Sequence, residues 1–246
     1  MRNLRLDLCY DGTRYRGWQR LTNSDNTIQG KLETVLSRIL GETIEISGSG
    51  RTDAGVHAKG QVANFHCENP MSAEEILAQL RQYLPEDIGV LSCKECSTRF
   101  HARLNAVEKT YCYRIWNSDQ PCVFERKYVW VMPQKLDLEN MRRAAVLLTG
   151  THDFLAFCSN KHFKKSSVRT IYSLQIEEVG SELRFVVTGN GFLYNMVRIL
   201  VGTLLAVGRG ELAPEDVLEI MERRTRERAG ETVPAKGLCL MEVVYE

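Results

Sequence analysis

The stretch Gly48–Gly60, which reads Gly-Ser-Gly-Arg-Thr-Asp-Ala-Gly-Val-His-Ala-Lys-Gly, combines one carboxylate with four glycines. Glycine adopts positive φ angles freely, so this composition predicts a tightly turning loop. Asp53 stands in the middle of the loop, and Arg51 precedes it by two residues. An ionised carboxylate held in this way can act as a nucleophile. The same pattern also fits a structural turn in which Asp53 caps backbone amides and Arg51 is solvated.

Two other kinds of functional loop do not fit this stretch. A dinucleotide-binding loop leads into a helix, whereas the strand-like segment Gln61–Phe65 follows here. A zinc deaminase needs His-x-Glu and Pro-Cys-x-x-Cys, but Lys59 and Ser92 stand where the Glu and the Pro should be. Cys93 and Cys96 form a lone CxxC, and a structural zinc ion needs four ligands. We therefore predict no metal site.

The elements that must position the loop follow from apolar periodicity and turn residues. They predict two halves of similar α+β organisation, residues 1–105 and 106–246. In the first half we expect strands at 4–10, 43–47, 61–66 and 88–95 and helices at 27–40 and 72–85. In the second we expect strands at 109–116, 169–179, 182–187 and 238–245 and helices at 138–148, at 192–207 and after Pro214. The absence of a strict βαβ rhythm favours two similar halves that share one mixed, mainly antiparallel sheet flanked by helices.

Composition places the chain among ordinary globular proteins, with 246 residues, 43% of them hydrophobic and 26% charged. The longest apolar stretch, 196–207, is interrupted by Arg198 and Gly202 and is well short of the ~20 residues of a membrane span. The N-terminus alternates like a strand and lacks the apolar block of a signal peptide. Eight scattered cysteines without a secretion signal indicate reduced thiols. We expect a soluble, cytoplasmic protein with no membrane contact.

The formal net charge of +1 does not by itself predict a nucleic-acid partner, so local basic clusters must carry that argument. Segment 14–20 interleaves arginines with aromatic residues, a composition that grips phosphates and stacks bases. Segment 161–169 contains no acid, and 223–228 is a third basic cluster. Each of them alone also fits a solvated surface. Together they predict RNA contacts, for which the candidates are Arg14, Arg16, Arg20, Lys164 and Lys165.

The string Gly50–Ala58 closely resembles the signature of the tRNA pseudouridine synthase A family. Further blocks that carry the resemblance follow in order along nearly the full chain: Tyr10-Asp-Gly-Thr13 with Gly17-Trp-Gln19, Lys109–Arg114, His152-Asp-Phe154, Gly189-Asn190, Phe192, Met196-Val-Arg198 and Gly208-Arg-Gly210. The resemblance implies an enzyme that isomerises uridine to pseudouridine at positions 38–40 of the tRNA anticodon stem-loop. It also implies a homodimer that needs no metal or cofactor.

The resemblance further implies a role for each of four residues: Asp53 is the nucleophile, Tyr111 stacks on the target uracil, Arg198 pairs with Asp53, and Arg51 helps to extrude or replace the target base. This set suits the reaction, in which uridine loses its N1–C1′ bond, turns and rejoins through C5. A nucleophilic carboxylate divides that difficult step into two easier ones, and an aromatic wall holds the freed base. By residue pattern alone, Tyr111 fits a core aromatic equally well. Arg198 also fits a side chain that reaches solvent from a helix edge.

Two departures from the family pattern bear on RNA contacts: Cys112 replaces an expected basic residue, and Tyr194-Asn195 stands where paired histidines are common. Two alternative functions remain, a non-catalytic RNA-binding protein of the same fold and a nucleoside or nucleotide hydrolase. A hydrolase would use a second carboxylate and a water, and the motif segments contain no such acid. The sequence leaves open which uridines and tRNAs are modified and which covalent route Asp53 takes.

Overall fold

The computed structural model describes residues 1–160 and 166–246, which fall into two compact units. Unit 1 comprises Met1–Val107 and Cys239–Glu246, and unit 2 comprises Glu108–Leu238. The division expected from the sequence kept the C-terminal strand with the second half. In the structure this strand, β10 (Leu238–Tyr245), pairs in parallel with β3 through Cys239 and Leu240. All of this strand except Leu238 therefore belongs to unit 1.

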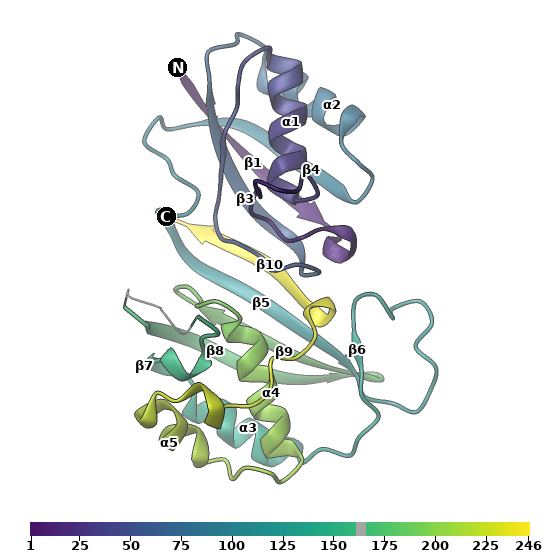
Figure 1. The fold of residues 1–246 in the computed structure, drawn as a ribbon, viewed down its shortest axis with the longest axis vertical. Coiled ribbons are helices and arrows are strands. Elements are labelled where there is room, and N and C mark those ends of the chain that lie inside the picture. The colour runs from purple at the N-terminus through teal and green to yellow at the C-terminus, as the bar shows by residue number, and fades with distance from the viewer. Residues whose placement is uncertain (161–165) are drawn as a thin grey trace. The chain divides into compact units, whose positions relative to one another are not determined.

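The sheet of unit 1 contains β1 (Arg2–Tyr10), β2 (Ile46–Gly48), β3 (His57–Cys67) and β4 (Ile88–Cys96), together with β10. The strand order is β4-β1-β3-β10, and β2 pairs with β3 (Figure 1). β1 is antiparallel to both of its neighbours, with Leu6 opposite Ala63 on one side and Cys93 on the other. Leu4, Leu6 and Leu8 are fully buried, as the apolar alternation of this segment predicts.

Two helices cover one side of this sheet (Figure 1). α1 (Ile28–Leu40) begins after Thr27, whose side chain accepts a hydrogen bond from Gly30 N, and it ends at Gly41 with φ 70°. α2 (Ala73–Tyr83) begins with the capping box that Ser72 and Glu75 predict. α1 and α2 contact each other, and α2 also packs on β4. Both helices agree with the expected segments to within two residues at each end.

Unit 2 has its own run of antiparallel strands, in the order β5-β9-β8-β7. The strands are β5 (Ala106–Trp116), β7 (Gly150–Asp153), β8 (Val168–Val179) and β9 (Glu182–Gly189), with the short β6 (Trp130–Val131) parallel to β5. The helices are α3 (Leu138–Leu147), α4 (Met196–Gly208) and α5 (Asp216–Arg223). α3 packs against α4 and β8, and all of α4 except Arg198 is buried. The sequence did not predict β6 or β7, which are short.

The start of α4 corrects the sequence prediction, which began this helix at residue 192. Asn195 has φ 61°, in the left-handed region, so the helix can begin only at Met196. This conformation costs most L-residues about 1–2 kcal/mol, but the short polar side chain of Asn tolerates it. Elsewhere the expected α+β class, with mixed and mainly antiparallel pairing, is confirmed. Within the described residues, no helix is both long and apolar enough to span a membrane.

Candidate active site

Asp53 lies in the loop between β2 and β3 of unit 1, as the glycine pattern predicts. Val56 N donates a hydrogen bond of 3.1 Å to Asp53 O, and Gly55 between them has φ 80°. This tight turn requires positive φ, which glycine supplies without strain. Exposure alternates along the loop, because Arg51 is exposed, Thr52 is buried and Asp53 is half-buried. Thr52 therefore faces the protein interior, while its two neighbours remain accessible.

Residues 12–18, which follow β1, contact the backbone of this loop. Trp18 N donates to Thr52 O at 3.0 Å. Gly17, with φ 91°, lies so close that a Cβ there would be 2.7 Å from Thr52 O, and a Cβ on Gly12 would be 2.0 Å from Val56 O. Only glycine fits at such approaches of two backbones. Two sequence blocks that resemble the family thus form one structure around Asp53.

A buried polar network holds the same loop from the sheet side. Tyr10 Oη lies 2.7 Å from Thr52 Oγ1, and Gln61 Nε2 donates to Gly50 O at 3.1 Å and to Tyr10 Oη at 3.4 Å. Ser49 Oγ donates to Gln61 Oε1 at 2.6 Å. All four of these side chains are at most 6% exposed. Sequence reasoning missed the network, although Tyr10 ends a predicted strand and Gln61 begins one.

Tyr111 lies on β5 of unit 2, opposite Val187 on β9, and is 8% exposed. Its ring meets that of Phe192 edge-on, with centroids 5.3 Å apart and an interplanar angle of 88°. Tyr113, on the same face of the strand, is fully buried and donates from Oη to Pro234 O at 2.8 Å. Burial raises the pKa of Tyr113 above its usual range. Tyr111 is thus the more accessible of the two tyrosines.

Arg198 lies in the first turn of α4 and is half-buried. Its Nε donates to Val233 O at 2.7 Å, and its Nη1 donates to Asn195 Oδ1 at 2.9 Å. Asn195 in turn donates to Ser159 Oγ at 3.0 Å. These contacts fix the guanidinium within unit 2, unlike a side chain that simply extends into solvent. Asp53 and Arg51 belong to unit 1, whereas Tyr111 and Arg198 belong to unit 2.

The predicted RNA-binding arginines differ in how they are paired. Arg14 is exposed and pairs with Asp87 at 2.6 Å. Arg20 lies 3.1 Å from the buried carboxylate of Glu33, so it neutralises an acid inside the fold. Arg16 is exposed, and no described residue forms an ion pair with it. Lys164 and Lys165 lie outside the residues that the structure describes.

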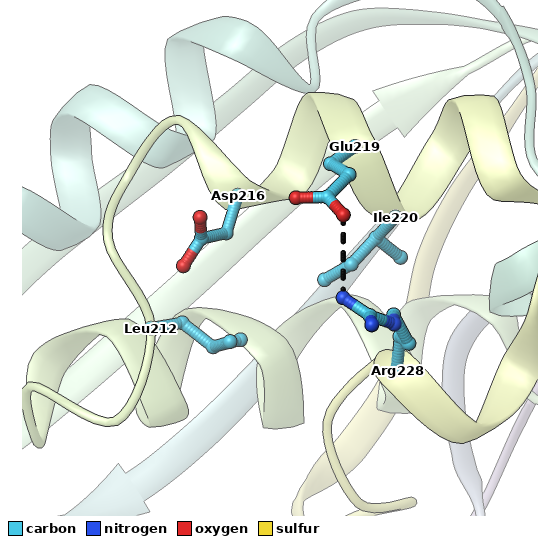
Figure 2. Close-up of a pocket in the computed structure, with 5 residues that line it drawn as sticks. All are labelled: Leu212, Asp216, Glu219, Ile220 and Arg228. Carbon is cyan, nitrogen blue, oxygen red and sulfur yellow. Dashed lines mark hydrogen bonds and ion pairs between the residues drawn. The ribbon is translucent and has the colours of Figure 1, made fainter.

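Most arginines of the third basic cluster, residues 223–228, form ion pairs within unit 2. Arg224 pairs with Asp153 at 2.9 Å, and Arg223 and Arg228 both pair with Glu219. A pocket of about 290 Å³ lies beside these groups. Figure 2 shows Arg228 directed at Glu219 across it, with the ion pair at 3.2 Å. The residues that line the pocket are Leu212, Asp216, Glu219, Ile220 and Arg228.

None of the predicted site residues that the structure describes lines this pocket, and its arginine is already neutralised. Among the described residues, no group of three or more His, Cys, Asp or Glu side chains is arranged to hold a metal ion.

Comparison with known proteins decides the family. The model of a family described as "tRNA pseudouridine synthase" matches residues 9–105 and 144–246. The chain belongs to the tRNA pseudouridine synthase family. It is accordingly an isomerase. The two matched segments of this synthase contain Asp53 and Arg198. Tyr111 lies in the unmatched stretch between the two segments.

Full-length relatives of the synthase agree with this assignment. It is 51% identical over 240 residues to tRNA pseudouridine synthase A of Bacillus sp. (strain KSM-64), with 98% of each chain covered. It is 46% identical over 245 residues to tRNA pseudouridine synthase A 2 of Bacillus anthracis, with 100% of each covered. Among solved structures, the crystal structure of a Cbf5-Nop10-Gar1 complex matches at 13% identity with a TM-score of 0.36. This match covers 82% of the synthase and 45% of that chain.

Proposed function

We propose that this synthase converts uridine to pseudouridine at positions 38–40 of the tRNA anticodon stem-loop, with Asp53 as the nucleophile. The observation that carries the proposal is the setting of Asp53. Asp53 is half-buried and so is not enclosed by the fold, and its loop is fixed by backbone contacts from Gly17 and Trp18. A carboxylate that is both accessible and rigidly held suits nucleophilic catalysis.

The reaction changes the substrate in four ways. The N1–C1′ bond breaks, the uracil turns, a C5–C1′ bond forms, and the proton lost from C5 is balanced by a proton gained at N1. Asp53 attacks the sugar or the base, or takes the C2′ proton, and it is regenerated at the end. No electrons are gained or lost in this isomerisation, so it needs no redox cofactor.

The other predicted residues complete the proposal. Arg51, exposed beside Asp53, helps to extrude the target base from the RNA stack. Tyr111 stacks on the freed uracil, which a ring held edge-on by Phe192 can do without rearranging. Arg198, which is already oriented by Val233 and Asn195, pairs with the Asp53 carboxylate. The partners in this proposal are tRNA and a second copy of the chain, in the cytoplasm.

The test is to incubate the purified protein with an unmodified tRNA transcript, without added metal, and to map pseudouridine along the RNA. We expect product at one or more of positions 38–40. Asp53→Asn keeps the shape of the side chain and removes its charge. It should bind the transcript within a few-fold of wild type and form no product, because the nucleophile is lost.

Two results would contradict the proposal in different ways. Substantial turnover by Asp53→Asn would exclude the nucleophilic role. Tight tRNA binding by the wild type without any product would instead favour the alternative of a non-catalytic RNA-binding protein. Product at other tRNA positions would leave the chemistry standing and refute the anticodon assignment.

A further inference from the structure

We propose that Thr52 is a positioning residue: its buried hydroxyl, held by Tyr10 and Gln61, sets where Arg51 and Asp53 stand toward the substrate. This inference rests on the proposed function, because it presupposes that Asp53 does chemistry. Thr52 itself touches no substrate in this proposal. It acts through the two residues that flank it.

Within this network, the hydrogen-bonding partners of Gln61 determine which groups donate and which accept. Gln61 Oε1 accepts from Ser49 Oγ at 2.6 Å and from Val62 N at 3.2 Å, which fixes the orientation of the amide. Gln61 Nε2 is then directed at Gly50 O and Tyr10 Oη. Because Tyr10 accepts from Gln61, its own proton is available to Thr52 Oγ1, 2.7 Å away. Burial raises the pKa of Tyr10, so this proton stays in place at neutral pH.

The network fastens the loop on both sides of Arg51. Gly50 is held through its carbonyl oxygen, and Thr52 is held through its hydroxyl and through its carbonyl, which accepts from Trp18 N at 3.0 Å. Arg51 between them is exposed. A residue fixed at both its side chain and its backbone restricts the backbone of its neighbours, so the Cα–Cβ bonds of Arg51 and Asp53 keep their directions. Fully satisfied buried networks of this kind rigidify the structure around them.

The network is more elaborate than a loop needs for stability alone. Buried polar side chains are costly unless every group finds a partner, and apolar residues would fill the same space at lower risk. Here four polar side chains, Tyr10, Ser49, Thr52 and Gln61, are buried together at the one loop that carries the proposed nucleophile. Their placement is explained if the geometry of Arg51 and Asp53 matters to within a fraction of an ångström, as catalysis requires.

The experiment compares two substitutions of Thr52 that differ in a single group. Thr52→Val replaces the hydroxyl by a methyl group of similar size, and Thr52→Ser keeps the hydroxyl. Each is measured for tRNA affinity and for single-turnover rate at saturating enzyme. We expect Thr52→Val to lose about 10- to 100-fold in rate, because small misplacements of reacting groups cost this much. Its affinity should stay within about threefold, and Thr52→Ser should recover most of the rate.

Tyr10→Phe removes the other partner of the hydrogen bond between Tyr10 Oη and Thr52 Oγ1. It should lower the rate to a similar degree, and the double variant Tyr10→Phe/Thr52→Val should be no slower than the slower single variant. Full additivity of the two effects would indicate independent roles and would overturn the proposal. If Thr52→Val does not fold, Tyr10→Phe alone carries the test through the same comparison of rate with affinity.

Ser37→Ala is the matched control, because it also removes one hydroxyl of unit 1 that is hydrogen-bonded within the fold. The Ser37 hydroxyl accepts a hydrogen bond from Ile44 N at 2.9 Å. The substitution should lower the melting temperature without changing the rate. If Thr52→Val changes only the melting temperature, as this control does, the role of Thr52 is structural and the proposal fails. Asp53→Asn separates the two hypotheses: an active Asp53→Asn refutes the proposed function, whereas an inactive one with a normal Thr52→Val refutes only this inference.

Discussion

At the scale of single residues, three consecutive positions, Arg51, Thr52 and Asp53, differ in their exposure to solvent and in the roles that we propose for them. The two charged side chains are accessible, and the threonine between them is buried and hydrogen-bonded. A buried anchor thus stands between two side chains that are more accessible. The anchor and the reactive groups are therefore adjacent in sequence.

The role of Tyr111 is tested by separating its ring from its hydroxyl. Tyr111→Phe keeps the ring that meets Phe192 edge-on, so it should retain tRNA binding and a rate within several-fold of wild type. Tyr111→Ala removes the surface on which the uracil stacks. We expect its single-turnover rate to fall about 10- to 100-fold, because base–aromatic stacking is worth about 1–3 kcal/mol.

Circular dichroism and tRNA affinity of both variants control for misfolding at this buried position. Equal loss of rate in Tyr111→Phe and Tyr111→Ala would refute pure stacking. It would assign proton transfer or hydrogen bonding to the hydroxyl instead.

At the scale of elements, the start of α4 links a backbone conformation to the orientation of Arg198. Asn195 has φ 61° and accepts from Arg198 Nη1. Asn195→Gly and Asn195→Ala both remove this acceptor, and both should lower the single-turnover rate about 10-fold, the worth of a hydrogen bond to a charged group. Asn195→Ala should also be less stable than Asn195→Gly by about 1 kcal/mol, because alanine is strained at positive φ.

Urea unfolding measures the difference in stability between these two variants, and single-turnover kinetics measure the rates. Rates that follow stability would show that the backbone at this position matters rather than the contact with Arg198. Unchanged rates in both variants would show that Val233 alone is enough to orient the guanidinium.

At the scale of the whole molecule, the arginines that we predict to bind tRNA differ in their ion pairs. Arg16 has no ion pair among the described residues, whereas Arg14 pairs with Asp87 and Arg20 with the buried Glu33. We expect Arg16→Ala to lower the slope of log affinity against log salt by roughly 0.7–0.9, the value for one lost phosphate contact. Arg20→Ala should mainly lower stability, because Glu33 would keep a buried charge without its partner.

Fluorescence anisotropy with labelled tRNA over a series of KCl concentrations measures these slopes. Gln19→Ala, a half-buried neutral neighbour in the same segment, is the control and should leave the slope unchanged. An unchanged slope in Arg16→Ala would show that this arginine is an ordinary surface charge.

The sequence by itself determined most elements and the family. The alternation of Leu4, Leu6 and Leu8, the Ser72 capping box and the glycines around Asp53 are local signals, and local physics decides strands, helix starts and turns. The motif string identified the Asp53 loop because its residues are contiguous. The catalytic roles given to Asp53, Tyr111 and Arg198 came from the family resemblance and stay predictions.

Only the tertiary structure decided which distant segments meet. The contact of Gly12 and Gly17 with the Asp53 loop, and the network of Tyr10, Thr52 and Gln61, join residues far apart in the chain, and no periodicity encodes such pairs. The C-terminal strand pairs with β3, which is far away in the chain, and the residue pattern of the strand does not show which partner it will have. The left-handed Asn195 makes the predicted helix begin later than expected for a similar reason: its side chain contacts Arg198 and Ser159, and the sequence pattern does not show these contacts.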